Sequence, residues 1–477
     1  IPFCDEDVKD ASECKERANT PRELFNKIDE LGLDALVIPH GTTWGIHSPA
    51  NSTMSSQLLN DNHDPKKQRL MEVYSGHGNS EVYKNIQHTK KLPSGGFECP
   101  LPTPEFEPCC WRAGEIVNQQ CLNETGKGCS DKADDIRKEF ANNSSGLLRF
   151  SLVENATQED WKQCGQLKDS FLPAYTYRPA MSSQAALASK VEIGNTVNSF
   201  KMGLIGSTDN HKARAGAGYK EFARKSMGDS WGAKDNLTWI LPPERGASFY
   251  STGGLVAVHA DKLERNNIYN SLYEREVYAT SGERILLWFN LIYDNQEIPM
   301  GSEIAIPSDP TFEVRALGSF KQLPGCPDYV HTAMSKEEIS RLCLNECYNP
   351  SNERYLIDRI EIVKILPTQN LDSLDEAIQD PWKTFECDDV GQGCSIGFQD
   401  NAFSSAKENA IYYVRAIQME TDAVGGDPLR CEYNEFGECI KIRPCYASGP
   451  DFDPSDDCLA PIGERAWSSP IFLNYLN

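Results

Sequence analysis

The first regular hydrophobic spacing in the chain predicts a helix followed by a buried strand. Residues 20–23 read Thr-Pro-Arg-Glu, a capping box with proline in the first helical position. Apolar residues then recur at helical spacing up to a glycine suited to end a helix, at Leu24, Ile28, Leu31 and Gly32. A continuous apolar run follows in residues 35–39, and His40 stands at its end. Such a run is typical of a strand covered on both faces.

The same form, a short apolar run closed by polar residues, recurs along the chain. We expect a helix in residues 184–197 and strands in residues 69–74, 202–206, 255–258, 276–278 and 285–289. Helices that alternate with fully apolar strands are typical of a parallel sheet or a barrel. The pattern therefore predicts an α/β architecture over residues 1–290.

Two parts of the chain depart from this pattern. Residues 97–173 are rich in Cys, Pro, Asn and Gly, and we interpret them as a disulfide-tied insertion on a loop of the α/β domain. Beyond residue 290, half-apolar stretches in residues 311–316, 360–364 and 412–416 predict antiparallel strands. Long turns with nine cysteines surround them. Residues 291–477 are therefore expected to form a smaller cysteine-rich β domain.

Cysteines and glycosylation sequons set the expected compartment. The 17 cysteines fall into two groups, eight up to Cys164 and nine from Cys326 onward, without a paired zinc-ribbon spacing. Six N-x-S/T sequons begin at Asn51, Asn123, Asn142, Asn143, Asn155 and Asn236. Disulfides and sequons together predict a secreted glycoprotein. Because 17 is odd, one thiol is free or its partner lies outside this chain.

Charge and hydropathy exclude two classes of partner. The formal net charge is −23, and no basic tract is present to neutralise phosphates, so we expect no nucleic-acid binding. The longest near-continuous apolar run, residues 285–293, is much shorter than the roughly 20 residues of a membrane-spanning helix. We therefore expect no membrane span.

Histidines and carboxylates near the ends of the predicted strands suggest a metal site. His40, His211 and His259 come directly after apolar runs, His77 lies a few residues past one, and Glu72 lies within one. Imidazole and carboxylate together suit Zn, Mn or Fe. Asp209, two residues before His211, can turn toward the same centre. Each residue also has a simpler interpretation, as a histidine bonded to a carbonyl or a carboxylate capping a helix.

The glycine-bearing loop after His211 contains two cations. Arg214 and Lys220 are candidates to hold a small anionic substrate near the metals, although ordinary loop packing explains them equally well. Nucleophile-elbow, phosphate-loop and H-E-x-x-H motifs are absent from the sequence.

Several of these segments resemble an uncharacterised domain-of-unknown-function family that is similar to the polymerase-and-histidinol-phosphatase (PHP) metal hydrolases. They are residues 35–40, 72–81 (EVYSGHGNSE), 203–211 (GLIGSTDNH), 248–260, 275–285, 346–350, 380–382 and 465–470 (RAWSSP). The resemblance implies a distorted β/α barrel with two or three ions of Mn, Zn or Fe. It matches Asp209 and His211 to an Asp-x-His ligand pair and His40 to a barrel histidine, with Glu72, His77 and His259 as further ligands.

The chain departs from the PHP pattern at its start. Such barrels open with a His-x-His strand, and no histidine precedes His40 here. We expect the N-terminal strands of the barrel to lie upstream or on a separate processed chain; the alternative is a degenerate site that has lost catalysis.

These observations predict a secreted metal-dependent hydrolase, with phosphoesters as the first substrate class and His77 or His259 as the residue that transfers a proton. A non-catalytic extracellular scaffold or binding glycoprotein remains the main alternative. A hydrolase of C–N or sulfate ester bonds is a third hypothesis.

Overall fold

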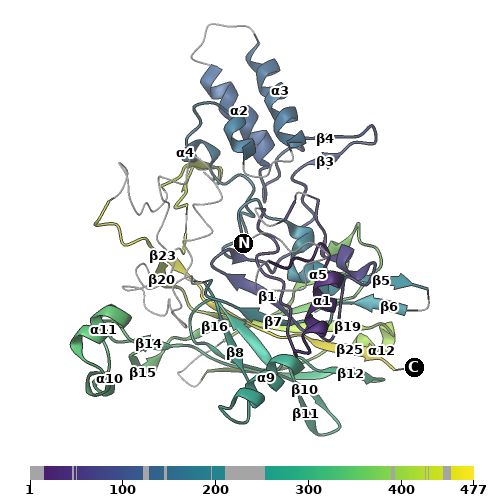
Figure 1. Ribbon diagram of the computed structural model, residues 1–477, viewed down its shortest axis with the longest axis vertical. Coiled ribbons are helices and arrows are strands. Elements are labelled where there is room, and N and C mark those ends of the chain that lie inside the picture. The colour runs from purple at the N-terminus through teal and green to yellow at the C-terminus, as the bar shows by residue number, and fades with distance from the viewer. Residues whose placement is uncertain are drawn as a thin grey trace.

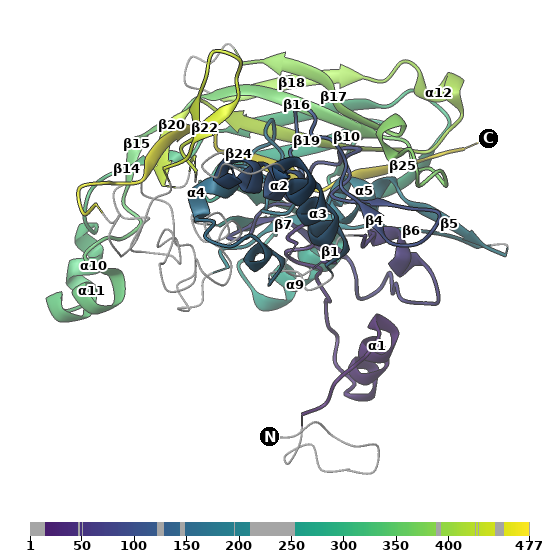
Figure 2. The ribbon, with the colours of Figure 1, turned by 90° about the horizontal axis from the view of Figure 1, so that it is seen from above.

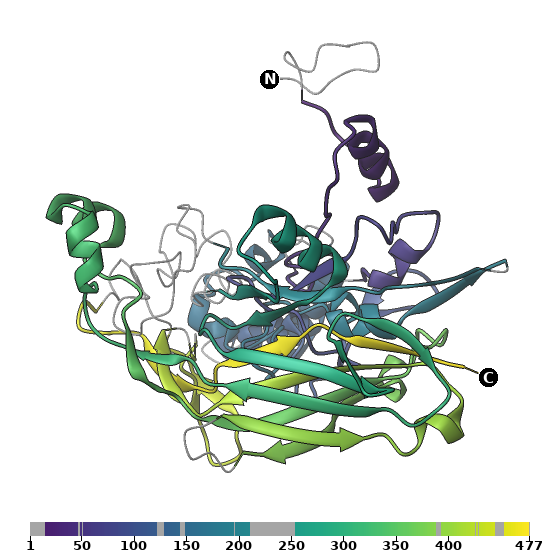
Figure 3. The ribbon, with the colours of Figure 1, turned by 90° about the horizontal axis from the view of Figure 1, so that it is seen from below.

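The computed structural model describes residues 15–45, 48–49, 51–121, 128–143, 148–194, 196–209, 253–387, 393–424, 426–427, 429–443 and 453–476. Its main body consists of β-sheets packed in layers (Figure 3), and a helical insertion projects from one side of them (Figure 1). The candidate site lies in the layer between the largest sheet and this insertion.

An eight-stranded sheet forms the middle layer. Its main path has the order β12-β25-β19-β24-β9-β8, and β16 joins it by pairing with β19 and with β17. The strands are β8 (Leu255–Val258), β9 (Val277–Thr280), β12 (Glu303–Ile306), β16 (Ile357–Ile365), β17 (Ile378–Glu386), β19 (Ala410–Gln418), β24 (Arg465–Ser468) and β25 (Ile471–Tyr475). All residues of β19 are buried, because both faces of this strand are covered.

A four-stranded antiparallel sheet covers one face of the middle layer. Its order is β11 (Gln296–Pro299), β10 (Leu286–Tyr293), β13 (Thr311–Leu317) and β18 (Cys394–Gln399). Alternate residues of β10 and β13 point inward and pack on alternate residues of β19, as in a β-sandwich, with Phe289, Phe312 and Tyr412 among the largest.

A small third layer covers the other face of the middle sheet. Here β1 (Leu70–Ser75) pairs in parallel with β7 (Gly203–Gly206) and antiparallel with the short β2 (Gly78–Asn79). Helix α5 (Ser183–Ala188) lies beside them. Their apolar residues pack against the second face of β19 and β24, including Tyr413 and Trp467. The third layer thus rests on strands that come late in the chain.

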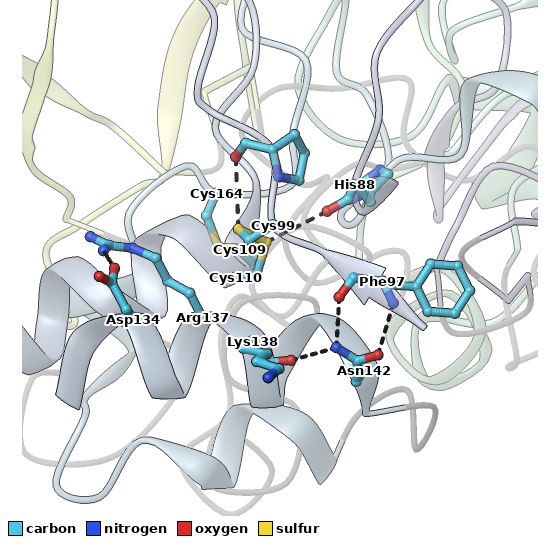
Figure 4. The surroundings of a disulfide bond; sticks show 11 residues. His88, Phe97, Cys99, Cys109, Cys110, Asp134, Arg137, Lys138, Asn142 and Cys164 are labelled. Atoms are coloured by element: carbon cyan, nitrogen blue, oxygen red, sulfur yellow. Dashed lines mark hydrogen bonds and ion pairs between the residues drawn. A yellow bond between two sulfur atoms is a disulfide. The ribbon is translucent and has the colours of Figure 1, made fainter. Parts of the chain in front are cut away.

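The predicted insertion is helical. Helices α2 (Cys109–Cys121), α3 (Cys129–Asn142) and α4 (Gln158–Trp161), the turn η2 (Leu148–Leu152), and the short strands β3 (Lys90–Lys91) and β4 (Phe97–Glu98) form a lobe at the top of Figure 1. The disulfides Cys99–Cys110, Cys109–Cys164 and Cys121–Cys129 hold it together. Figure 4 shows two of these bonds side by side above the helices.

The remaining elements lie at the periphery. Helix α1 (Pro21–Glu30) stands apart from the sheets (Figure 2). Others are η1 (Met54–Leu58), η3 (Pro179–Met181), β5 (Lys190–Ile193), β6 (Thr196–Ser199), α9 (Arg265–Glu274), β14 (Phe320–Gln322), α10 (Asp328–Ala333), α11 (Lys336–Cys343), β15 (Pro350–Arg354), η4 (Leu374–Glu376), α12 (Phe403–Ala406), β20 (Thr421–Val424), β21 (Glu432–Tyr433), β22 (Cys439–Lys441) and β23 (Leu459–Ile462).

The prediction of a distorted PHP-like β/α barrel is wrong. The described residues form mostly antiparallel sheets, and no barrel closes among them. Parallel neighbours need a long crossover connection, usually a helix. In the described chain the paired strands are parallel only in β1–β7 and β12–β25, whereas β8 and β9 pair antiparallel. Strands β1, β7 and β9 are buried over their whole length, whereas β8 is partly exposed and β10 alternates between buried and half-buried residues. The burial arises from stacked sheets and not from helices around a barrel.

Two local expectations also change. Residues 34–40 are extended but form no assigned strand; Val37 donates a backbone hydrogen bond to Lys67, and Pro39 accepts one from Glu72. The expected helix at residues 184–197 is helical only in α5, and the rest is the hairpin β5–β6. The eight-stranded sheet takes β8 and β9 from before residue 290 and its other strands from after it.

Candidate metal site

Strand β1 and the turn after it carry two of the predicted ligands. Glu72 lies within β1, whose residues are all buried, and His77 lies in the turn between β1 and β2. Gly78 has φ +100°, a conformation that favours glycine. A Cβ at Gly76 would lie 3.0 Å from the Cβ of Asp209, so the glycine allows the turn to approach that residue closely.

Three of the predicted ligands face one another. His40, Glu72 and His77 each present a ligand atom, and these atoms all lie within 4.8 Å of one another. His40 is exposed, whereas Glu72 and His77 are buried. Asp209 adjoins this group from just beyond β7, where its Oδ2 lies 3.0 Å from Nε2 of His77. We call His40, Glu72, His77 and Asp209 the metal-ligand cluster.

Neutral groups orient the side chains of the cluster. The Glu72 carboxylate accepts hydrogen bonds from the Gly41 backbone N–H at 3.2 Å and from the Ser207 hydroxyl. The Nδ1 atom of His77 lies 3.1 Å from the Ser75 hydroxyl, and the Trp44 ring lies 4.8 Å from the His77 ring, centre to centre. A hydrogen bond at Nδ1 leaves Nε2 as the nitrogen that can bind a metal.

The charge of Glu72 is the unusual feature of the cluster. Its side chain is only 6% exposed, yet it makes no ion pair with a lysine or arginine within the described ranges. A buried carboxylate is costly unless it is paired or binds a metal. Two imidazoles and a second carboxylate beside it complete a donor set that Zn, Mn or Fe accepts.

His259 lies apart from the cluster. It follows β8, its Nε2 contacts the Leu287 carbonyl oxygen at 2.9 Å, and its ring packs near Tyr278 and Trp288. Burial lowers the pKa of His259, with the Leu287 hydrogen bond acting in the opposite direction. His259 therefore matches the simpler interpretation, a histidine bonded to a backbone carbonyl.

Several predicted residues fall outside the described parts of the chain. They are the ligand candidate His211, the substrate candidates Arg214 and Lys220, and the sequon asparagines Asn123 and Asn236. Their roles stay predictions.

A second carboxylate of the same sequence segment lies in a different environment. Glu81 is fully buried, and its carboxylate accepts hydrogen bonds from Tyr413 at 2.7 Å, Arg415 at 3.0 Å and Trp467 at 2.6 Å. Arg415 also pairs with Asp380, and with Glu361 at 2.8 Å. We call these six residues the arginine network.

The arginine network joins the third layer to the middle sheet. Burial alone would lower the pKa of Arg415, but Glu81 and Asp380 outweigh it and hold that pKa well above its usual range. Part of this network has a signal in the sequence, since Glu81, Asp380 and Trp467 lie in three of the segments that carry the family resemblance. For Arg415 and Tyr413 the pattern predicts only a place in a strand.

The described sequon asparagines differ in their surroundings. Asn51 and Asn155 are exposed. Asn142 instead bridges α3 to β4 (Figure 4): its amide nitrogen donates to the carbonyls of Phe97 and Lys138, and its amide oxygen accepts from the Phe97 backbone N–H. Because a glycan would replace an amide hydrogen used here, Asn142 is a poor acceptor in this fold, although its sequon overlaps that of Asn143.

The disulfides are compatible with an extracellular protein. Besides those of the insertion, Cys326–Cys347, Cys387–Cys394 and Cys431–Cys439 are bonded, while Cys343 is a free thiol. Within the described residues, every helix is too short or too polar to span a lipid bilayer.

Comparison with known proteins gives similarity over part of the chain. An uncharacterised protein of Chlamydia pneumoniae is 39% identical over 61 residues, which make up 13% of this chain and 9% of that protein. An uncharacterised protein of Chlamydia muridarum (strain MoPn / Nigg) is 39% identical over 57 residues, 12% of this chain and 8% of that protein. The chain thus matches less than a tenth of the length of either relative. No solved structure matches it significantly.

The model of one family matches a longer segment. Residues 155–307 match a family described as "Protein of unknown function (DUF3604)". This segment includes β7 and Asp209 but begins after His40, Glu72 and His77. None of these similarities supports the PHP part of the expected resemblance. The match confirms that residues 155–307 are related to an uncharacterised domain family, DUF3604.

Proposed function

We propose that this protein is an extracellular metal-dependent hydrolase whose metal is held by His40, Glu72, His77 and Asp209. The observation that carries the proposal is the buried carboxylate of Glu72, which faces two imidazoles and has no cationic side-chain partner within the described chain. A divalent cation would neutralise this charge. The donor set suits Zn, Mn or Fe, and this group supplies ligands for one ion.

Each residue of the cluster has a distinct part in the proposal. A bound metal would supply an activated water and a positive charge for the reacting group. Ser207 and Gly41 fix the Glu72 carboxylate, and Ser75 fixes the ring of His77. Asp209 lies next to His77 and is partly exposed; in this proposal one of its carboxylate oxygens would bind the metal and the other would accept a proton from an incoming water. Phosphoesters are the substrate class we propose.

Metal content of the natively purified chain tests the first half of the proposal. We expect at least one equivalent of Zn, Mn or Fe by plasma mass spectrometry, lost in His40→Ala and in Asp209→Asn. His259→Gln is the matched control, because His259 also follows an apolar strand but lies outside the cluster; it should keep its metal. Equal metal content in wild type and in a His40→Ala/Asp209→Asn double variant that still folds would overturn the site.

Hydrolysis of p-nitrophenyl phosphate and bis(p-nitrophenyl) phosphate tests the second half. We expect turnover that a chelator abolishes and that the matching ion restores. A metal-loaded chain that hydrolyses neither ester would leave a metal-binding protein and refute the phosphoesterase assignment.

A further inference from the structure

A cavity of about 780 Å³ lies beside the hairpin β5–β6, and none of the four residues of the metal-ligand cluster lines it. Its walls are the hairpin β5–β6, the chain between β16 and β17, and the turn after α12. The volume falls within the range of about 300–1,000 Å³ that is typical of small-molecule sites.

The cavity is lined by both apolar and polar residues. Val197, Leu366 and Pro367 are at least partly exposed and supply apolar surface. Side chains that donate and accept hydrogen bonds surround them, among them Thr368, Gln369, Asn370 and Ser373. A ligand with an apolar face and several hydroxyl groups matches this arrangement.

Three lysines line this cavity of a strongly acidic chain. Lys201 pairs with Glu303 at 3.2 Å. Lys190 and Lys407 make no ion pair or side-chain hydrogen bond with any residue that the structure describes. Glu376 and Glu408 also line the cavity, so its charge is nearly balanced rather than strongly positive. This composition suits a ligand with one acidic group and disfavours a polyanion.

We propose that this cavity binds an acidic saccharide, such as a uronic-acid disaccharide. Lys190 and Lys407 pair with its carboxylate, the amide and carboxylate side chains hydrogen-bond its hydroxyl groups, and the apolar residues Val197, Leu366 and Pro367 contact the C–H face of a sugar ring. A nucleotide fits less well, because its phosphates would bring several negative charges to a lining whose own charge is nearly balanced. The proposal is independent of the metal-ligand cluster.

Calorimetric titration with cellobiouronate, with its neutral counterpart cellobiose as reference, tests the proposal. We expect wild type to bind the uronate at least tenfold more tightly than cellobiose, with an affinity that falls as salt is raised. Lys190→Gln/Lys407→Gln should lose that tenfold preference. Lys441→Gln, which removes an exposed lysine on β22 outside the cavity, should keep it.

Thermal melting of each variant shows whether its fold is retained. We expect retention because Lys190 is only half-buried, Lys407 is exposed, and neither side chain makes an ion pair with a described residue. Absence of uronate binding at millimolar concentration would overturn the proposal. Equal uronate preference in wild type and in the folded double variant would also overturn it.

Discussion

Glu72 and Glu81 lie nine positions apart in one segment. Both carboxylates are buried, but they differ in whether a cationic side chain neutralises their charge. Glu81 is surrounded by the guanidinium of Arg415, a phenol and an indole N–H. Glu72 has a backbone N–H, a hydroxyl and two neighbouring imidazoles. The charge of the first is neutralised within the fold, whereas that of the second has no cation from the described side chains.

This difference distinguishes a structural carboxylate from a candidate ligand better than burial does. Both glutamates are almost inaccessible to solvent. What differs is whether the surroundings already contain a positive charge and fill the lone pairs with strong donors. A carboxylate with such partners gains little free energy by binding a metal. We therefore infer that Glu81 stabilises the turn that carries His77 and is not a ligand.

Removal of Arg415 should have the largest effect. Arg415→Met leaves Glu81, Asp380 and Glu361 without their shared cation in the arginine network. We expect a loss of about 3–5 kcal/mol in the free energy of unfolding. Urea denaturation with disulfides intact measures it. Arg22→Met, which breaks the exposed pair with Asp61, is the control and should cost no more than about 1 kcal/mol. Similar losses in the two variants would contradict the role of the network.

Crossed substitutions of the two glutamates test the comparison directly. Glu81→Gln should lower the unfolding free energy by about 1–3 kcal/mol. The amide nitrogen of glutamine is a hydrogen-bond donor, and it would face groups that donate hydrogen bonds to the carboxylate in wild type. This variant should keep the rise in melting temperature that a bound metal produces. Glu72→Gln should abolish that rise while changing the metal-free melting temperature much less. If Glu81→Gln abolished the metal-induced rise in melting temperature and Glu72→Gln kept it, Glu81 and not Glu72 would be the ligand.

Ser207 offers a smaller, graded change to the metal-ligand cluster. Ser207→Ala removes the hydroxyl that donates to Glu72 but leaves the Gly41 N–H in place. We expect metal affinity to fall by about tenfold. Competition with a chromophoric chelator measures it, and Ser405→Ala on α12 should leave it unchanged. An unaltered affinity in Ser207→Ala would mean that the hydroxyl does not orient the carboxylate.

His259 should give the smallest effect, visible only as a pH dependence. Its folded pKa lies below the ordinary value of 6.5, so the unfolded chain takes up a proton that the folded chain resists. Its contribution therefore destabilises the fold as pH falls from about 6.5 toward the folded pKa. His259→Gln should flatten the decline of unfolding free energy in that window, without loss of metal. An unchanged pH profile would show that other groups cause the decline.

The sequence predicted many elements but not their arrangement. The capping box placed α1 correctly, with the Thr20 hydroxyl accepting from the Glu23 N–H. Strands β1, β7, β8 and β10 also lie where apolar runs were found. A run buried on both faces, however, does not reveal whether helices or further sheets cover it. Pairing partners such as β9 and β24 lie nearly two hundred residues apart, and no local pattern encodes that choice.

Where the local motif is short, the sequence indicates which candidate side chains lie close together. Glu72 and His77 lie around one turn, so their proximity follows from a few residues, and His40 and Asp209 flank the same strand pair. His259 has the same local pattern as His40. It differs because β8 lies at an edge of the middle sheet, where the Leu287 carbonyl is within reach. That contact depends on tertiary structure and has no signature in the sequence.

The position of β24 and β25 in the middle sheet has a consequence for biosynthesis. Both strands flank β19, and β24 also borders β9, yet they are made after residue 464. The helical lobe can form its own disulfides soon after residue 164 emerges, since its cysteines are close in sequence. The sheet cannot be completed until residues 465–475 have been synthesised, which makes folding slow and dependent on contacts of high sequence separation. Until then the open edges of β9 and β19 are exposed to aggregation, so we expect the nascent chain to rely on chaperones.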